Sequence, residues 1–552
     1  MSKRYNWKRN RISILIIIST LISFSFLIAR VDLYRNISDN WKLMYDVYKK
    51  IMTNYSDQID PQKLAVAGIE GMLEELDPYT VYLERDERQN LDMLTKGQYG
   101  GVGIQLGMRD DSLTVIAPMD DTPAQRSGIL PGDRIVGIDG ESTKDINLEM
   151  AAKKIRGKQG TTVILSIVRY GEKYPHDFEL TRAIIKIQDV PYFGMVTENI
   201  GYIRLTRFSR NSYTEIRKAF TSLMEQEANE IIIDLRGNPG GLLDASIRIL
   251  DMVIEKGEVL LSTKGRVSES NREFLSQSDP IVDSSISLAI LIDGGSASAS
   301  EIVAGAIQDL DRGVVIGTKS FGKGLVQTVY PLDRDRSLKM TTAKYYIPSG
   351  RLIQRPGYIK EHIILNEMDE DSLFSTHSGR KVMANGGISP DIELTLEKIP
   401  PLTRECWRRG LFFKFASIHI QNNDVSLPIK IDSTVLSDFR EFLLNKDISL
   451  NLPGEKQFSL LAESLDSVSV ENLLVRHSLD QLESYFEENK TNQFDIEQEW
   501  LTIGLEREIS SMLGGISARI ESSFDDDKFI LKAIEILSDQ VTYLNTLNLS
   551  DL

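Results

Sequence analysis

The fold of this chain is decided by residues 288–304, which read LAILIDGGSASASEIVA. The first five residues are apolar, and a short apolar run before a turn is typical of a buried strand. A turn of small residues follows, and a helical pattern begins at about Ser298. Strands that pass through short turns into helices are typical of a sheet with helices on its faces. The segment therefore predicts an α/β core, with room for a substrate at the turn.

The same alternation continues on both sides of this segment. Strand-like runs at residues 231–235 and 314–317 alternate with helical patterns at 213–225 and 242–254. Strands that alternate with helices in this way favour a parallel sheet. We therefore assign residues 186–398 to one α/β domain.

Three further regions differ from this core in their patterns. Residues 31–96 have apolar side chains at helical spacing, which predicts a helical N-terminal region. Residues 97–185 contain short β-type runs between Gly, Pro and Asp turns, which predicts a separate domain. Residues 399–552 return to amphipathic helical patterns. We expect a mixed α/β protein with a β-rich domain inserted before the core and an acidic helical C-terminal extension.

The composition excludes several classes of function. The 552 residues carry a formal net charge of −16, which disfavours a nucleic-acid partner because phosphates are bound by clustered Lys and Arg. Residues 461–552 hold 19 acidic and 6 basic side chains, so most of this negative charge belongs to the C-terminal helices. We interpret it as the solvated face of those helices. Cys406 is the single cysteine, which excludes an intramolecular disulfide and a cysteine metal cluster. We expect no cofactor and no metal.

The N-terminus carries a candidate membrane segment. Five basic side chains among the first eleven residues precede an uncharged, mainly apolar run over residues 12–29, about long enough to cross a bilayer. Basic residues favour the cytoplasmic side. Residues 1–30 therefore predict a cytoplasmic stub with an anchor, and the rest of the chain is expected on the periplasmic side of the inner membrane. A cleaved signal peptide is the alternative, although the run does not end in an Ala-x-Ala pattern.

Three serines occupy the turn, at positions 296, 298 and 300. A serine at a helix start lies where backbone N–H groups and the positive end of the helix dipole can stabilise a developing oxyanion. The same side chains are ordinary N-cap candidates, because serine is favoured at that position. The segment alone leaves a nucleophile and a purely structural role open.

A serine nucleophile needs a base that accepts its proton. None of the five histidines lies in the glycine-rich turns of the core, so a Ser-His-Asp triad is disfavoured. Lys323 lies between two glycines, and burial would lower its pKa towards the range in which a lysine acts as a base. An exposed loop lysine is the alternative. The surrounding residues do not match a phosphate-binding loop.

A second glycine turn, DLRGNPGG at residues 234–241, follows a strand-like run. Such a turn can present a backbone N–H to an oxyanion, or it can simply connect a strand to a helix. Its pattern does not distinguish the two.

Taken together, these motifs resemble the carboxy-terminal processing proteases, a family of serine-lysine peptidases with an inserted PDZ domain. The resemblance covers about Leu33 to Leu394 and does not extend to residues 400–552. The motifs occur in the family's order: GMLEELDPYT (71–80), GGVGI (100–104), PAQRSGILPGDRI (123–135), the turn at 234–241, SASASE (296–301) and FGKGLVQ (321–327).

The resemblance implies a ClpP/crotonase-like α/β core and a serine-type endopeptidase that cleaves exported proteins near their C-termini. It implies that Ser298 is the nucleophile, that Lys323 is the general base and that Gln327 orients the lysine. The implied oxyanion donors are the backbone N–H groups of Ala299 and of either Gly240 or Gly241.

The glycine-rich start of the PDZ-like region also has a physical interpretation. Backbone N–H groups there can hold a terminal carboxylate while the adjacent strand pairs with an extended peptide. Substrates would then be proteins or peptides with free C-termini. The alternative is that this domain binds no peptide and only positions the helical N-terminal region. The expected peptide-binding residues are Gly100, Gly101, Val102, Gly103 and Ile104. The helices after residue 399 are a candidate surface for a second copy of the chain or an adaptor protein.

Two other classes of function compete with a peptidase. A catalytically silent scaffold would hold C-termini without cleaving them. An acyl hydrolase would use the same serine on a small ester, but it would leave the PDZ-like region unexplained. Cleavage of a peptide tail would separate a peptidase from both.

Overall fold

The computed structural model describes residues 34–109, 111–169, 171–358, 373–384, 386–395, 397–446, 448, 450–467 and 473–549. The chain divides into two compact units, Met1–Tyr82 and Leu83–Leu552. The predicted membrane segment at residues 12–29 lies outside the described residues. Within the described ranges, no helix combines the length and the apolar character needed to cross a membrane.

The first unit is helical, as its apolar spacing predicts. One helix spans residues 34–54, α2 spans Pro61–Glu74, and the short strand β1 (Val81–Leu83) begins at the end of the unit. Asp60 caps α2, because its side chain accepts the backbone N–H groups of Gln62 and Lys63 at 2.9 and 3.2 Å. The hydroxyl of Tyr48 donates to the carbonyl of Pro61 at 2.9 Å and ties the two helices together.

The second unit begins with α3 (Arg85–Lys96) and continues into a small β-rich domain. The domain has its own hydrophobic core, which includes Val115, Ile135 and Leu165. Its main sheet has the strand order β3-β4-β5-β7-β8, so β3 lies at an edge, and β6 pairs with β5. The elements of this domain are β2 (Gln98–Gly101), β3 (Ile104–Arg109), β4 (Ser112–Pro118), α4 (Pro123–Arg126), β5 (Arg134–Ile138), β6 (Glu141–Ser142), α5 (Leu148–Ile155), β7 (Thr162–Val168), β8 (His176–Thr181) and β9 (Ala183–Lys186).

The strands that enter and leave this domain pair with each other. Gln98 lies opposite Lys186 and Gly101 lies opposite Ala183 in an antiparallel ladder of β2 with β9. The two ends of the domain therefore meet, which is the geometry of an insertion into a larger fold.

The core of the second unit is a six-stranded sheet with the order β10-β11-β12-β15-β16-β21. β10 is antiparallel to β11, and every later pair is parallel. This arrangement confirms the predicted mixed α/β class. The elements of the sheet and its covering helices are β10 (Tyr192–Met195), β11 (Ile200–Arg204), α6 (Ser212–Glu225), β12 (Glu230–Asp234), α7 (Leu243–Leu250), β15 (Ser287–Ile292), α8 (Ala299–Asp309), β16 (Val314–Gly317) and β21 (Ile392–Glu393).

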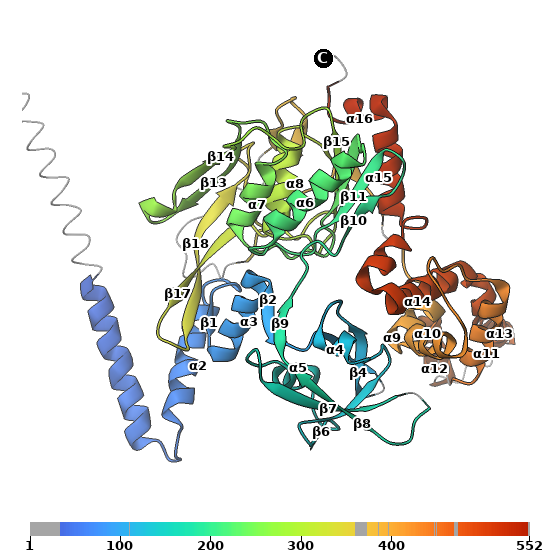
Figure 1. Ribbon diagram of the computed structural model, residues 1–552. Coiled ribbons are helices and arrows are strands. Elements are labelled where there is room, and N and C mark those ends of the chain that lie inside the picture. Colours follow the sequence, from blue (N-terminus) through green and yellow to red (C-terminus); the bar gives the residue numbers. More distant parts are fainter. Residues whose placement is uncertain are drawn as a thin grey trace, which may run out of the picture. The chain divides into compact units, whose positions relative to one another are not determined.

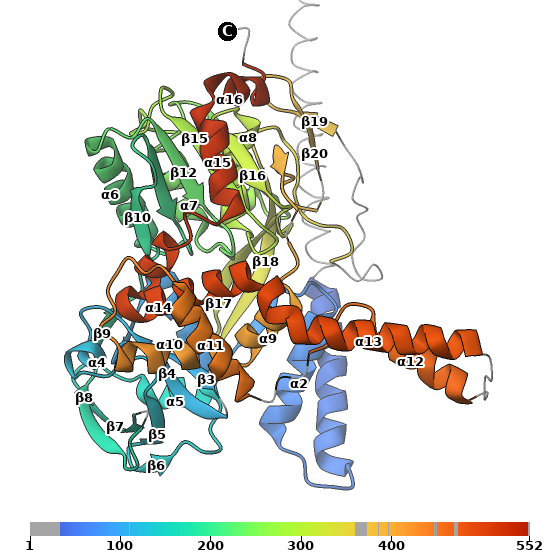
Figure 2. The ribbon, with the colours of Figure 1, turned by 90° about the vertical axis from the view of Figure 1, so that its right-hand side faces the viewer.

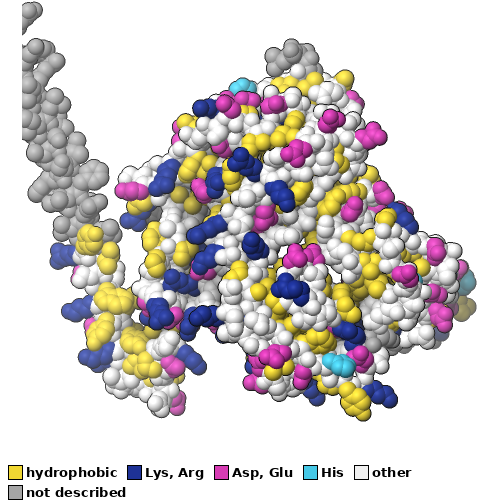
Figure 3. All heavy atoms as spheres, in the orientation of Figure 1, with side chains coloured by type: hydrophobic (Ala, Val, Ile, Leu, Met, Phe, Trp, Pro, Cys, Tyr) yellow, Lys and Arg dark blue, Asp and Glu magenta, His cyan; other side chains and the backbone are white. Residues whose placement is uncertain are grey.

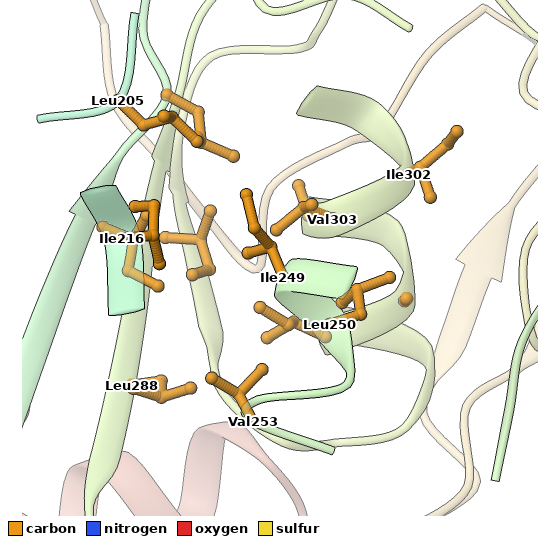
Figure 4. Packing of buried hydrophobic residues seen from close by; sticks show 14 of the residues in the cluster. Leu205, Ile216, Ile249, Leu250, Val253, Leu288, Ile302 and Val303 are labelled. Carbon is orange, nitrogen blue, oxygen red and sulfur yellow. The ribbon is translucent and has the colours of Figure 1, made fainter. Parts of the chain in front are cut away.

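Helices α6, α7 and α8 cover one face of this sheet (Figure 1). Figure 4 shows the packing on that face, where Val303 of α8 points towards Ile249 of α7. Every residue of α8 is buried, so the helix that begins at the serine turn has a fixed position. Because α8 is completely buried and closely packed, the serine turn before it is also held in place.

A second, antiparallel sheet lies beside the first and carries the lysine motif at its edge. β17 pairs with β18 along its whole length, and β13 pairs with both β18 and β14. The strands are β13 (Val259–Gly265), β14 (Arg272–Leu275), β17 (Leu325–Pro331) and β18 (Ser337–Tyr346); η1 (Ser268–Ser270) connects β13 to β14, and β19 (Leu373–Ser375) pairs separately with β20 (Lys381–Met383).

The C-terminal region is helical, as predicted. A cluster of buried side chains, among them Phe412, Phe439 and Leu505, joins most of its helices, and buried Glu497 caps α9 by accepting the N–H groups of Leu402 and Thr403. The helices are α9 (Pro401–Arg408), α10 (Leu411–Asn422), α11 (Ser433–Leu444), α12 (Glu455–Ser467), α13 (Leu473–Ile496), α14 (Gln498–Glu521), α15 (Lys528–Ser538) and α16 (Gln540–Thr546).

The last two helices of the C-terminal region contact the core sheet. α15 and α16 cover the second face of the core sheet, opposite α6 to α8 (Figure 2). Ile530 and Ala533 are fully buried against sheet residues such as Ile232 and Leu291. The last part of the predicted extension over residues 399–552 therefore packs on the core sheet.

Candidate active site

The turn after β15 is held by two side chains. Asp293 Oδ1 accepts the N–H groups of Gly237 and Gly295, both at 2.8 Å. Ser296 is buried, and its hydroxyl donates to the carbonyl of Leu235 at 2.8 Å. These bonds join the end of β15 to the neighbouring 234–241 turn. Ser296 therefore has a structural role.

Ser298 differs from the other two serines of the turn. Ser300 is buried and donates to the carbonyl of Asn238 at 2.9 Å, whereas Ser298 is partly exposed and lines a cavity. Ser298 is the N-cap of α8 and has φ 56° and ψ −112°. Residues other than glycine rarely adopt positive φ, and such strained residues are concentrated at functional sites.

Glu301 connects the serine turn to the lysine loop. Its Oε2 accepts the backbone N–H of Ser298 at 2.8 Å and that of Lys323 at 2.9 Å. Its Oε1 accepts the hydroxyl of Ser320 and the N–H of Gly322, both at 2.6 Å. Burial raises the pKa of Glu301, and these four donors oppose that rise. The carboxyl group is thus the common acceptor for both segments that carry the predicted dyad.

Tyr345 of β18 makes a second connection between the same segments. Its hydroxyl lies 3.2 Å from the carbonyl of Ser298 and 2.5 Å from that of Lys323. Burial raises its pKa well above the usual value, and the charge of Glu301 adds to the rise. The neutral phenol therefore persists as a hydrogen-bond donor.

Ser298, Lys323 and Gln327 line one cavity of about 420 Å³. Gln327 lies in β17 beside a register shift, and its Nε2 donates to the hydroxyl of Thr341 at 3.3 Å. Much of the remaining wall is apolar and includes Leu242 and Leu325. The structure therefore brings the three residues of the predicted catalytic set to one enclosed surface.

The 234–241 turn forms the opposite wall of this cavity. A Cβ on Gly240, which has φ +94°, would lie 2.8 Å from the Ala299 nitrogen and 2.6 Å from the Ala297 carbonyl oxygen. A Cβ on Gly241 would lie 2.1 Å from the carbonyl oxygen of Phe208. Only glycine permits this approach of the turn to the start of α8.

The two glycines of the turn differ in their hydrogen bonds. The N–H of Gly240 donates to Asn238 Oδ1 at 2.9 Å. The N–H of Gly241 makes no hydrogen bond to another described residue. Of the two predicted alternatives for an oxyanion donor, Gly241 is the one whose N–H is not used within the turn.

The base of the turn is anchored by a buried charge cluster. Burial alone would raise the pKa of Asp234, but the Arg236 and Arg204 guanidinium groups beside it hold that pKa at about 2. Each arginine lies 2.6 Å from a carboxylate oxygen of Asp234. Arg236 also lies 2.9 Å from Asp527, just before α15, so the C-terminal helices contact this turn directly.

The described histidines lie away from this cavity. His176, His377, His419 and His477 are not among its lining residues, and His362 lies outside the described residues. Within the described ranges, no group of His, Cys, Asp and Glu side chains could hold a metal ion. Cys406 is buried in the helical C-terminal region, and burial raises its pKa to about 12.

A second, smaller cavity lies in the β-rich domain, between β3 and α5. It measures about 180 Å³, and Val102, Gly103 and Ile104 line it. The N–H groups of Val102 and Gly103 make no hydrogen bond to another described residue. Of the predicted peptide-binding residues, Gly100 and Gly101 lie elsewhere, because β2 pairs them with Ile184 and Ala183 of β9.

The sequence interpretation did not identify Glu301 or Tyr345. The spacing Ser-x-x-Glu from Ser298 is a capping-box pattern, which could have assigned Glu301 to the serine turn. Its contacts with Ser320, Gly322 and Lys323 and the position of Tyr345 depend on tertiary structure.

Comparison with known families gives four matches along the chain. The profile of peptidase family S41 matches residues 199–365, and that of the PDZ domain matches residues 92–168. The profile named activating protease CtpB N-terminal domain matches residues 30–87. A profile named probable PDZ-protease, C-terminal helical domain, matches residues 402–537, so similarity to known proteins also extends over the C-terminal helices.

Individual proteins give the same result. The carboxy-terminal-processing protease of Bartonella bacilliformis is 39% identical over 329 residues, which are 59% of this chain and 75% of that protein. The carboxyl-terminal-processing protease of Synechocystis is 34% identical over 331 residues, again 59% and 75% of the two chains. Among solved structures, the photosystem II D1 C-terminal processing protease is 27% identical, covers 65% of this chain and 88% of its own, and has a TM-score of 0.37.

Proposed function

Because the chain belongs to the carboxy-terminal-processing proteases of peptidase family S41, we propose that it is a serine endopeptidase with a Ser298–Lys323 dyad. One observation carries the proposal. Ser298, Lys323 and Gln327 line the same cavity, and Glu301 joins the serine turn to the lysine loop.

Ser298 is the proposed nucleophile. Its oxygen attacks the scissile carbonyl carbon, a C–O bond forms, and the hydroxyl proton passes to the Lys323 amine. Collapse of the tetrahedral intermediate breaks the C–N bond, and Lys323 returns the proton to the leaving amine. Water then hydrolyses the acyl-enzyme. Burial of Ser296 and Ser300 and their bonds to backbone carbonyls support the choice of Ser298.

Lys323 must be neutral to accept this proton. It lies in the wall of a cavity that is partly apolar. Gln327 lies in the same wall and is proposed to orient the amine. Both residues act only if the loop holds Lys323 at a fixed position, and the contacts of Glu301 and Tyr345 support that condition.

The proposed oxyanion donors are the N–H groups of Ala299 and Gly241. Ala299 is the first residue of α8, so its N–H lies at the positive end of the helix dipole. Gly240 is proposed to have a different role, since its own N–H donates to Asn238 and its lack of a side chain permits the close approach of the turn.

The PDZ domain is proposed to hold the C-terminus of the substrate. β3 is an edge strand, so it has room to pair with an added peptide strand. The unused N–H groups of Val102 and Gly103 are suited to a terminal carboxylate, and the cavity beside Leu148 and Ile155 is suited to an apolar final side chain.

Residues 12–29 are proposed to anchor the chain in the inner membrane, with the catalytic part on the periplasmic side. The support is the apolar run preceded by five basic side chains. Protease added to intact spheroplasts should degrade the catalytic part and spare a tag fused to the N-terminus. Protection of the catalytic part would refute this orientation.

The test of the function uses the full chain in detergent and unstructured peptides with apolar C-termini. Mass spectrometry should detect cleavage by the wild type and none by Ser298→Ala or Lys323→Ala. Amidation of the peptide C-terminus should reduce capture by the PDZ domain. Binding without cleavage by the wild type would instead favour a peptide-binding scaffold.

A further inference from the structure

We propose that the catalytic cavity contains a carboxylate-binding subsite formed by Arg207 and Lys339, so that preferred substrates carry an acidic group close to the scissile bond. The inference rests on the proposed function, because it assigns a substrate class to the same cavity.

The cavity differs in charge from the rest of the chain. The whole chain has a net charge of −16. Besides Lys323, which is neutral as the proposed base, the charged side chains among the described residues of the cavity wall are Arg207 and Lys339, and no Asp or Glu of the described chain lines it. A cavity lined by charges of one sign and by apolar walls concentrates ligands of the opposite sign. The field of this cavity therefore favours an anionic substrate group.

Arg207 is fixed beside the proposed oxyanion turn. The next residue, Phe208, donates its N–H to the carbonyl of Gly240 at 3.0 Å and accepts the N–H of Leu242 at 2.7 Å. The side chain of Arg207 is three-quarters buried, which excludes much of the competing water. Its position is thus set by the same backbone that shapes the catalytic cavity.

The hydrogen-bonding capacity of Arg207 is incompletely used. Its Nε is buried beside Asp189 Oδ1 at 3.3 Å, and neither of its Nη groups makes a hydrogen bond to another described residue. A guanidinium has five N–H donors in a planar fork, which matches the two oxygens of a carboxylate. Arg207 can therefore bind a substrate carboxylate without giving up a hydrogen bond.

Lys339 supplies a second positive charge from a different element. It lies in β18 opposite Val329 of β17, is partly buried, and has no ion-pair partner among the described acidic residues. Figure 3 shows Lys and Arg side chains gathered in the middle of the displayed face, over the part of the core beside β17 and β18. The surface beside the cavity thus carries charge of the same sign as the cavity wall.

In a peptide, a carboxylate comes from an Asp or Glu side chain or from the C-terminus itself. The apolar side chains of Leu242 and Leu325 line the same cavity, so the favoured peptide combines an apolar residue with a nearby acidic group. Both sources would present a carboxylate to the cavity, and matched peptides distinguish a side-chain carboxylate from a terminal one.

The test compares the rates of cleavage of matched peptides by the full chain in detergent. Glu replaces Gln, one position at a time, within three residues on either side of the cut, and each peptide is made with a free and with an amidated C-terminus. In the wild type, a well-placed Glu should raise kcat/KM roughly three- to tenfold, mainly through KM. A gain that follows the free C-terminus instead, and that Lys339→Gln removes, would identify the terminal carboxylate as the group bound in the cavity.

The variants Arg207→Gln and Lys339→Gln should each remove this preference while Gln-containing peptides are still cleaved. Lys339→Glu should reverse it and favour a Lys-containing peptide, an effect that simple structural damage would not produce. Lys256→Gln, an exposed residue that does not line the cavity, is the matched control and should keep the wild-type preference. Arg207→Gln also removes the ion-pair partner of buried Asp189, so this variant can misfold. The Lys339 variants do not disturb that pair, and they keep the test valid in that case.

Equal cleavage of acidic and neutral peptides by the wild type, with no effect of Lys339→Gln on the preference for a free C-terminus, would overturn the subsite and leave the proposed function intact. Failure to cleave any of the peptides would overturn both.

Discussion

Glu301 accepts the backbone N–H of Lys323 at 2.9 Å, although the two residues are 22 positions apart in the sequence. The same carboxylate oxygen accepts the N–H of Ser298. One buried side chain therefore fixes the distance between the backbone segments that carry the proposed nucleophile and the proposed base. Proton transfer between two side chains depends on such a distance.

Replacing Glu301 tests this relationship. Glu301→Gln keeps the shape of the side chain. Its amide NH2 group, however, is a donor, and it would face backbone N–H groups that the Glu301 carboxylate accepts in the wild type. We expect kcat to fall by about 100-fold, since small misplacements of catalytic groups have effects of that size, and KM to change little. Initial rates of peptide cleavage check this, with circular dichroism as a control for folding. Wild-type kcat in a folded Glu301→Gln protein would contradict the account.

Gly240 provides a steric test of the turn. Gly240→Ala would place a Cβ within 3 Å of backbone atoms of residues 297 and 299, at a φ of +94° that alanine rarely adopts. We expect loss of activity together with reduced stability. Gly294→Ala is the matched control, because a Cβ there meets no atom within 4 Å. An active Gly240→Ala protein would show that the turn need not approach α8 so closely.

Asp189 should make stability depend on pH. Burial raises its pKa from 3.8 to about 6, while the hydroxyl of Ser209 opposes the rise. Between these two values the folded state holds a proton that the unfolded state has lost, so the contribution of Asp189 to stability falls as the pH rises from about 4 to 6.

Asp189→Asn removes this contribution, so the thermal midpoint of the variant relative to wild type should rise across that pH window. The midpoints of both proteins, measured at matched pH values, check the slope. Asp279→Asn, an exposed control, should follow wild type. A flat difference for Asp189→Asn would mean that the group does not titrate in this range.

Helix α15 should behave as part of the core. Ile530 is fully buried against the sheet, so Ile530→Ala should lower the free energy of unfolding by about 2–5 kcal/mol. Leu531→Ala, on the neighbouring exposed position, should stay within about 0.5 kcal/mol of wild type. Denaturant midpoints measure both. An unaffected Ile530→Ala protein would contradict the assignment of α15 to the core.

Local sequence patterns predicted several elements of the fold accurately. The predicted strands at 231–235 and 314–317 match β12 and β16 to within one residue, because continuous apolar runs end at clear turn residues. The helix predicted over 242–254 is shorter, since α7 ends at Leu250. Asp251 then accepts the hydroxyl of Ser276, a contact that no local pattern shows.

The candidate site could be predicted only where a motif carries it. Ser298 and Lys323 follow from short motifs, whereas Arg207 has no distinctive neighbours and reaches the cavity from the loop after β11. Gly100 and Gly101 were assigned to peptide binding because the sequence does not show their pairing with β9, more than eighty residues later. The positions of Arg207, Gly100 and Gly101 depend on contacts between segments that are distant in the sequence, and local motifs do not show such contacts.

The central claim is that Ser298 forms an acyl-enzyme with help from Lys323. The most direct measurement mixes the full chain with a cleavable peptide, stops the reaction with acid within milliseconds to seconds, and searches for the acyl adduct by mass spectrometry. The account predicts an adduct on the fragment that contains Ser298 in the wild type, none in Ser298→Ala, and a much slower appearance in Lys323→Ala. Peptide cleavage that survives Ser298→Ala, or an adduct on a different residue, would contradict it.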